Sequence, residues 1–381
     1  MARIVQLANF VSPLSGGIRT TLDALGAGYE AAGHERLLVV PGRKDAIDGH
    51  RIVLRGPRIP GQPYRVLVDV ERVRQVVRGL RPDRIEVSDK LTLRSIGRLG
   101  PPSVLLSHER LDAILRPRVP GVVPLRLVSD VVNRRLAAAF GRVVCASSFS
   151  AEEWRRIGAS PAVVPLGVDL DVFRPDAGTA LPEARRHHVE LVTVGRLSME
   201  KRPDRAVDAV ARLRAAGVDA ALTFVGDGPL RDRLESTVQR RRLPVRFAGH
   251  LADRAAVAAA LASADVAVCP CPHETFGLAA LEALACGTPI AVPRHGALPE
   301  LVSETIGDGG PAACGAANDD LAAAVKACLR STTRAAARRR AESFPWSRAV
   351  SALLDAHDLP PRASDTSAGS EQRVRGRTPR G

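Results

Sequence analysis

The sequence predicts an α/β protein with two Rossmann-like, doubly wound domains that face a central cleft. Short β-branched segments alternate with longer Ala-, Leu- and Arg-rich segments of helical period, which is typical of βα units and parallel sheets. The length of 381 residues suits two domains of ordinary size, each with its own core. A Pro- and Gly-rich stretch over 163–182 separates two series of predicted strands, and we expect a hinge close to Pro165 and Gly167.

Each half of the chain contains one series of strands. The first series covers 4–8, 36–40, 84–87, 104–107 and 143–146. The second covers 191–194, 221–225, 245–247, 266–269 and 289–292. Doubly wound sheets bind ligands beyond the carboxyl ends of their strands, so loops from both halves can line one cleft.

Composition indicates a globular protein with an aliphatic core. Hydrophobic residues make up 45% of the chain and charged residues 25%, whereas aromatic residues contribute only 3%. The formal net charge of +14 suits an anionic partner such as an acidic lipid surface, although GC-rich coding would also explain the excess of Arg over Lys. No basic run is interleaved with aromatic residues, so we expect no nucleic-acid partner.

Targeting and zinc-binding patterns are absent from the sequence. The N-terminus runs directly into an apolar, strand-like segment without the pattern of an export signal, and the longest apolar stretch, 255–268, is too short to span a bilayer. We therefore expect a cytoplasmic protein whose membrane contact is peripheral. The six cysteines lack zinc-ligand spacing and are predicted to be reduced core residues.

The most informative segment is 273–287, an apolar helical pattern with two glutamates. Glu282 lies inside the apolar run, where a carboxylate is costly unless it accepts strong hydrogen bonds, which the two hydroxyls of a ribose would donate. Glu274 lies just before the helix, whose N-cap we expect to be Thr275. A diphosphate would be stabilised there by the backbone N–H groups of Phe276, Gly277 and Leu278. A pair of salt-bridged glutamates is the alternative, but two acids beside an anion-binding helix start favour a binding site.

Residues after other strands extend this candidate site. Arg196 and Lys201 follow the strand that ends at 194 and would neutralise two phosphates, unless they are simply solvated at the surface. Gly16 and Gly17 join the first strand to a helix and would let backbone N–H groups approach a phosphate or sugar, although a tight turn explains them as well. His108 follows a first-domain strand and either hydrogen-bonds a sugar hydroxyl or has a structural role.

Two acidic positions have competing interpretations. The carboxylate of Asp253 would accept hydrogen bonds from the ring N–H and the exocyclic amine of guanine, or else cap a helix. Asp169-Leu170-Asp171 resembles the metal-binding carboxylates of another transferase class, yet it lies in the hinge region. We interpret it as a turn and expect neither a metal nor another cofactor.

Taken together, these motifs resemble the retaining GT-B glycosyltransferases of family 4 over about residues 1–359. The most specific feature is the seven-residue spacing between Glu274 and Glu282. The resemblance implies that Glu282 binds the donor ribose and Glu274 the transferred sugar. It also implies that Arg196 and Lys201 bind the diphosphate, and that His108 reaches the sugar from the opposite domain.

The resemblance also implies a domain order. An acceptor-side domain would cover 1–166 and a nucleotide-sugar-binding domain 167–343, followed by a helix over 344–360 that crosses back to the first domain. Residues 361–381 are poor in apolar residues and rich in Arg, Ser, Gly and Thr, so we expect a disordered basic tail.

Within the family, segments 87–95 and 107–112 resemble actinobacterial mannosyltransferases of phosphatidylinositol mannoside synthesis. This implies a metal-independent enzyme with GDP-mannose as donor and a phosphatidylinositol mannoside glycolipid as acceptor, which adds the third mannose through an alpha-1,6 bond. The protein would then work at the inner face of the plasma membrane.

The acceptor side of the sequence leaves several functions open. Basic residues flank an apolar segment over 114–136 and form either an interfacial patch on anionic lipid or a solvated helix face. They are Arg116, Arg118, Arg126, Arg134 and Arg135. Three other functions stay open: a family 4 transferase with another nucleotide sugar and a small soluble acceptor, a nucleotide-sugar epimerase, and a non-catalytic binding subunit.

Overall fold

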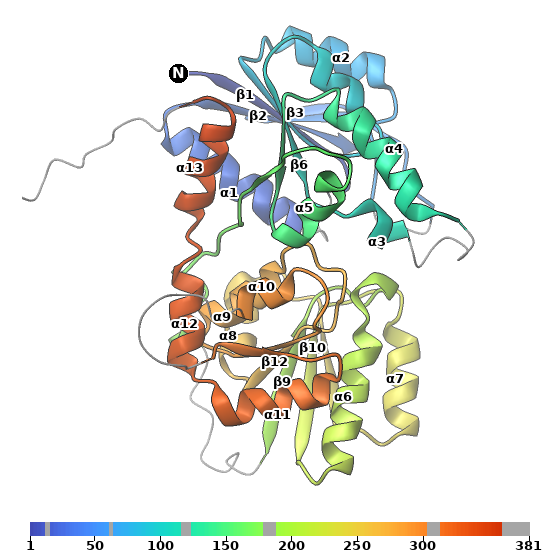
Figure 1. The fold of residues 1–381 in the computed structure, drawn as a ribbon, viewed down its shortest axis with the longest axis vertical. Helices are drawn as coiled ribbons and strands as arrows, with labels where there is room; N and C mark the ends of the chain where they lie inside the picture. The colour runs from blue at the N-terminus through green and yellow to red at the C-terminus, as the bar shows by residue number, and fades with distance from the viewer. Residues whose placement is uncertain (12–15, 61–63, 116–122, 178–187, 303–312, 360–381) are drawn as a thin grey trace, which may run out of the picture.

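The protein consists of two lobes, each built around a parallel sheet (Figure 1). The computed structural model describes residues 1–11, 16–60, 64–115, 123–177, 188–302 and 313–359. The predicted α/β fold with two Rossmann-like sheets is confirmed. The predicted tail, 361–381, lies outside the described residues.

The N-terminal sheet has the strand order β3-β4-β2-β1-β5-β6-β7-β8. Its strands are β1 (Arg3–Ala8), β2 (Glu35–Gly42), β3 (Ala46–Asp48), β4 (Arg51–Arg55), β5 (Arg84–Ser88), β6 (Ser103–Ser107), β7 (Arg142–Cys145) and β8 (Ala162–Val163). All neighbours pair in parallel except β3 and β4, which form an antiparallel edge. Helices cover both faces of such a sheet, so its central strands are almost continuously apolar.

The C-terminal sheet has the order β11-β10-β9-β12-β13-β14 and is parallel throughout. Its strands are β9 (Val189–Val194), β10 (Ala220–Val225), β11 (Val245–Gly249), β12 (Val266–Val268), β13 (Ile290–Val292) and β14 (Gly315–Ala317). All ten predicted strands are present, whereas β3, β4, β8 and β14 were not predicted. The short β14 consists of Gly and Ala, which have no β-propensity signal.

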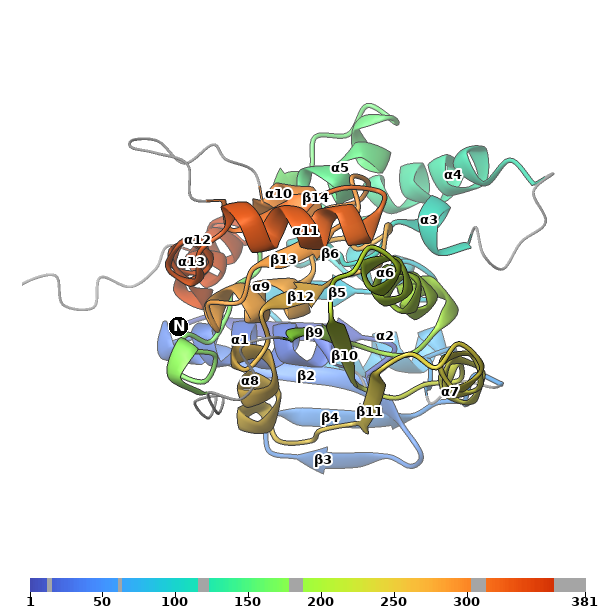
Figure 2. The ribbon, with the colours of Figure 1, turned by 90° about the horizontal axis from the view of Figure 1, so that it is seen from below.

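Helices pack on both faces of each sheet. Those of the N-terminal lobe are α1 (Gly17–Ala31), α2 (Val70–Gly79), α3 (Leu111–Leu115), α4 (Leu125–Ala137) and α5 (Ser148–Arg155). The later helices are α6 (Pro203–Ala215), α7 (Arg231–Arg240), α8 (Arg254–Ala262), α9 (Leu278–Ala285), α10 (Leu298–Val302), α11 (Leu321–Ser331), α12 (Arg334–Glu342) and α13 (Trp346–Ala356). Figure 2 shows α8 and α9 on one side of the C-terminal strands and α6 and α7 on the other. Among the described residues, no helix is long and apolar enough to cross a bilayer.

The chain passes between the lobes twice, and the two passages lie side by side. The backbone N–H of Val168 donates to the carbonyl oxygen of Phe344 at 3.0 Å. Gly167 lies against the backbone of Trp346, where a side chain on Gly167 would collide. After this crossing, α13 packs on α1 of the N-terminal lobe, as Figure 1 shows. The domain limits at 166, 343 and 360 stay predictions.

Candidate active site

The start of α9 lies where the two lobes meet, and it differs from the sequence prediction. The helix begins at Leu278, and its N-cap is Gly277 in the left-handed region, with φ at 97°. Thr275 is therefore not the N-cap. Its hydroxyl instead donates to the carbonyl oxygen of His108 in the other lobe, at 2.5 Å. The N–H groups of the first helical turn have no partner within the helix, which makes this end a favourable place for an anion.

Glu274 forms an ion pair with Lys201 just before the N-terminal end of this helix. The Nζ atom of Lys201 lies 2.9 Å and 2.7 Å from the two carboxylate oxygens. Burial lowers the pKa of Lys201, but the adjacent Glu274 carboxylate more than offsets this, so the pKa lies above its usual value. Lys201 therefore carries a positive charge at neutral pH, next to the helix start where phosphates would bind.

Glu282 has a different environment on the same helix. Its carboxylate has no hydrogen-bond or ion-pair partner among the residues that the structure describes. Burial raises the pKa of Glu282 to about 7, which Arg254 partly counteracts and Asp169 reinforces. Since the residue is still partly exposed, a ligand with hydroxyl donors can reach it.

Arg196 reaches across the cleft to a residue that the sequence did not point to. Its Nη1 donates to the hydroxyl oxygen of Tyr64 at 3.2 Å, and the guanidinium carbon lies 5.3 Å from the centre of the Tyr64 ring. Phe10 contacts the same ring edge-on, with centroids 6.1 Å apart. An aromatic ring that packs under an Arg stabilises it by a cation–π interaction. The residues next to Tyr64 in the sequence form no motif that would have predicted this contact with Arg196.

His108 lies at the carboxyl end of the N-terminal sheet and is half-buried. Its Nε2 is 2.9 Å from the Ser88 hydroxyl. Burial lowers the pKa of His108 to about 4, with a further decrease from Lys90 and an opposing effect of Glu86. The ring is neutral at pH 7 and can offer hydrogen bonds but no charge.

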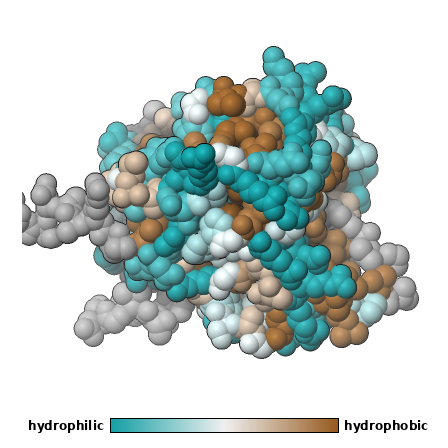
Figure 3. All heavy atoms as spheres, turned by 90° about the horizontal axis from the view of Figure 1, so that it is seen from above, coloured by the Kyte–Doolittle hydropathy of each residue, from teal (hydrophilic) through white to brown (hydrophobic). Residues whose placement is uncertain are grey.

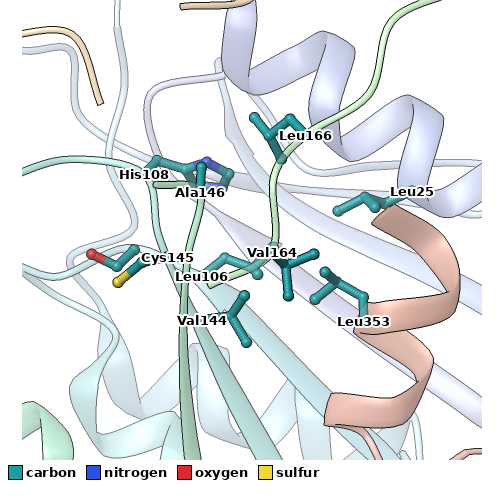
Figure 4. Close-up of a pocket in the computed structure, with 10 residues that line it drawn as sticks. Leu25, Leu106, His108, Val144, Cys145, Ala146, Val164, Leu166 and Leu353 are labelled. Atoms are coloured by element: carbon teal, nitrogen blue, oxygen red, sulfur yellow. The ribbon is translucent and has the colours of Figure 1, made fainter. Parts of the chain in front are cut away.

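His108 also borders a pocket of about 260 Å³, a volume that includes open solvent (Figure 4). Figure 4 shows its imidazole ring at the edge of a group of mainly aliphatic side chains, which come from α1, β6, β7, the segment after β8, and α13. The labelled lining residues are Leu25, Leu106, His108, Val144, Cys145, Ala146, Val164, Leu166 and Leu353.

The two segments that resemble mannosyltransferases, 87–95 and 107–112, are in contact through Lys90 and Glu109. Lys90 forms a buried ion pair with Glu153 on α5 and donates to the carbonyl oxygen of Glu109 at 2.5 Å. Glu153 in turn accepts from the backbone N–H of Leu111 at 3.1 Å. Glu153 was not predicted, because it lies on a different helix, far from both segments in the chain.

The remaining candidates from the sequence have separate positions in the structure. Gly17 begins α1 opposite α9, since the nearest atom to a Cβ placed on Gly17 is the Leu278 Cδ1, at 3.6 Å. Asp253 is exposed and caps α8, with its Oδ1 accepting from the Ala255 N–H at 3.0 Å. Asp169 forms the expected turn and pairs with Arg254 at 3.1 Å. Within the described ranges, no group of three or more His, Cys, Asp or Glu residues could hold a metal ion.

Comparisons with known proteins identify families and relatives that match both lobes. Residues 15–172 match the family described as Glycosyltransferase Family 4, and residues 184–343 match Glycosyl transferases group 1. A Mycobacterium tuberculosis protein named GDP-mannose-dependent alpha-(1-6)-phosphatidylinositol dimannoside mannosyltransferase is 46% identical over 376 residues, which cover 92% of this chain and 95% of that protein.

More distant relatives share part of the chain or only its fold. D-inositol 3-phosphate glycosyltransferase of Geodermatophilus obscurus is 36% identical over 254 residues, which cover 60% of this chain and 54% of that protein. Sucrose-phosphate synthase from Thermosynechococcus elongatus superposes with a TM-score of 0.72 over 94% of this chain and 98% of its own. At 19% identity, this likeness shows the fold alone. The matches over both lobes and the near full-length relative show that the chain is a glycosyltransferase and belongs to glycosyltransferase family 4.

Proposed function

We propose that this protein transfers mannose from GDP-mannose to phosphatidylinositol dimannoside and forms an alpha-1,6 bond. The similarity to the mycobacterial enzyme of that name carries the proposal, because it covers 92% of the chain and hence both the donor and the acceptor lobe. A likeness restricted to the C-terminal lobe would support only a shared donor.

The residues around α9 would bind the donor. Glu282 has an accessible carboxylate without a partner, which suits the two hydroxyls of the ribose. Lys201 and Arg196 supply positive charge for the diphosphate at the start of α9. Glu274, adjacent to both the helix start and Lys201, would contact the mannose, and the exposed Asp253 the guanine.

The remaining donor contacts come from backbone groups and from the opposite lobe. The neutral ring of His108 would hydrogen-bond a mannose hydroxyl. The backbone N–H groups of Phe276, Gly277 and Leu278 would stabilise the diphosphate, and those of Gly16 and Gly17 would approach it from the N-terminal lobe.

Transfer with retention would take place on one face of the sugar. The bond from C1 of mannose to the phosphate oxygen breaks, the acceptor hydroxyl oxygen bonds to C1 on the same face, and a phosphate oxygen of the leaving GDP takes the acceptor proton. Arg196 and Lys201 would stabilise the negative charge that develops on this phosphate, without a metal ion.

The acceptor would be reached at an anionic membrane surface through α4. Leu127, Val128 and Val131 are 65%, 43% and 44% exposed and lie on one face of this helix. The same helix exposes Arg126, Arg134 and Arg135, a combination suited to anionic lipid, whereas Arg116 and Arg118 lie outside the described residues. Figure 3 shows brown, hydrophobic surface at the lower right of the N-terminal lobe, on the side of α4 and bordered by hydrophilic surface. We place the protein peripherally at the cytoplasmic face of the plasma membrane.

A transfer assay tests the proposal. Labelled GDP-mannose is incubated with the protein and anionic vesicles that contain phosphatidylinositol dimannoside, and the product is analysed for a third, alpha-1,6-linked mannose. Parallel reactions contain inositol phosphate without vesicles, or UDP-glucose in place of GDP-mannose. The proposal predicts a mannolipid in the first reaction only. Turnover restricted to inositol phosphate would instead favour the activity named for the Geodermatophilus relative.

A further inference from the structure

Two hydrogen bonds join the donor side of the cleft directly to the acceptor side. The Thr275 hydroxyl donates to the carbonyl oxygen of His108 at 2.5 Å. The backbone carbonyl of Thr275 accepts from the hydroxyl of Ser147 at 2.6 Å. Thr275 follows Glu274 directly in the chain, so one residue links the proposed sugar-binding carboxylate to two elements of the N-terminal lobe.

We call the two bonds of Thr275 to the N-terminal lobe the junction. A third contact between the lobes lies next to it. The carboxylate of Glu300 on α10 accepts hydrogen bonds from the backbone N–H groups of Ser148 and Phe149, at 2.9 Å and 2.8 Å. These groups form the N-terminus of α5, where a negative charge is favourable. Since Ser147 caps the same helix, α5 is held by the C-terminal lobe at the point where it contacts Thr275.

The junction fixes the separation between Glu274 and His108. The two residues belong to different lobes, and a hinge movement would change their separation unless something couples them. The bond from Thr275 ends on the backbone of His108, while the His108 ring is held by Ser88 at 2.9 Å. Small misplacements of groups around a reacting centre reduce rates strongly.

We infer that Thr275 is a positioning residue, which sets His108 against Glu274 so that closure of the cleft and assembly of the sugar site occur together. This inference rests on the proposed function, since it concerns transfer of the donor sugar. Thr275 itself contacts neither GDP nor the acceptor in this role. Its hydroxyl serves only to join the two lobes.

The variants Thr275→Val and Thr275→Ser separate the hydroxyl from the size of the side chain. We measure GDP affinity by calorimetry, kcat and KM for mannolipid formation, and the share of GDP-mannose that is hydrolysed without transfer. For Thr275→Val we expect kcat to fall by about 10- to 100-fold, GDP affinity to change by less than about 3-fold, and hydrolysis to rise because the cleft excludes water less well. Thr275→Ser keeps the donor hydrogen and should restore kcat.

Ser147→Ala provides a second test, with Ser150→Ala as its matched control. Both substitutions weaken the capping box of α5, but only Ser147→Ala removes the bond to Thr275. A lower kcat for Ser147→Ala than for Ser150→Ala supports the inference. This test does not depend on whether Thr275→Val folds.

Three outcomes would overturn the inference. They are a wild-type kcat in Thr275→Val, a loss of GDP affinity in proportion to the loss of kcat, and equal rates for the two serine variants. A wild-type protein that transfers no mannose would instead refute the proposed function.

Discussion

Two carboxylates, one in each lobe, show opposite ways of accommodating a buried acid. Glu86 on β5 is fully buried and accepts hydrogen bonds from Gln6 and Tyr29, both at 2.6 Å, and its Oε2 lies 3.1 Å from the His357 Nε2. Burial alone would raise the pKa of Glu86. His357 and the hydrogen bonds from Tyr29 and Gln6 lower the pKa by more than burial raises it, so the pKa lies below its usual value.

Glu282 on α9 is half-buried and has none of these donors. Its pKa is raised to about 7, and the structure shows no partner for it among the described residues. The comparison teaches that burial alone does not mark a functional acid. Where the fold supplies the donors, the carboxylate joins structural elements, here β5 and the end of α13. Where it does not, as at Glu282, we propose that a ligand supplies the donors.

The largest expected effect concerns the stability of the N-terminal lobe. Glu86→Gln leaves His357 and Tyr29 without the carboxylate, and we expect a loss of about 3 kcal/mol in the free energy of unfolding at pH 7. Because the pKa of Glu86 is depressed, its contribution exists above the unfolded pKa and disappears as the pH falls through the folded pKa. Denaturant titration measures the loss, with the half-exposed Glu235→Gln on α7 as the control. Equal stabilities of both variants would contradict the structural role.

The second effect concerns donor binding. Glu282→Gln should weaken GDP-mannose binding by about 2–3 kcal/mol, or roughly 30- to 150-fold, because a charged acceptor for two hydroxyls is lost. We expect no loss of stability, since the carboxylate has no internal partner. Calorimetric titration measures the affinity and thermal denaturation the stability. Unchanged affinity together with a large loss of stability would reverse the roles of the two acids.

The third effect is a pH dependence specific to Glu282. Its pKa is raised to about 7 in the free protein, so a ligand that needs the ionised carboxylate binds about 10-fold more weakly at pH 6 than at pH 8. The same raised pKa means that the stability contribution of this group falls as the pH rises from the unfolded pKa towards 7. GDP-mannose is a suitable probe, and Glu282→Gln should bind it with equal affinity at both pH values. A wild-type affinity independent of pH would rule out the ionised form as the binding form.

The smallest expected effect is that of a metal chelator. In the proposed site, Lys201 and Arg196 supply the positive charge for the diphosphate, so we expect EDTA to leave the rate of mannose transfer unchanged. The rate is measured before and after extensive dialysis against the chelator, and again after addition of magnesium. A drop that magnesium reverses would show that these side chains do not suffice for the diphosphate.

Local sequence patterns predicted most of the fold, whereas the residues assigned to the donor site stay a prediction. The ten predicted strands formed because β-branched runs between helical segments leave few alternatives. The apolar helix with Glu282 was recognised from its pattern alone. The prediction of Thr275 as N-cap failed, because a hydroxyl that is suited to cap its own helix was used for a contact with the other lobe. Tyr64 and Glu153 were missed for a related reason, as their partners are distant in the chain.

The sequence by itself determined the α/β class, the two sheets, and the spacing of glutamates and cations that resembles family 4. These features depend on residues close together in the chain, where periodicity and capping preferences act. Only the tertiary structure decided which acid is satisfied, since Glu86 and His357 are 271 residues apart. It also decided which groups join across the cleft, such as Thr275 with His108, 167 residues apart. Such pairs are made by the packing of whole lobes, which no local pattern encodes.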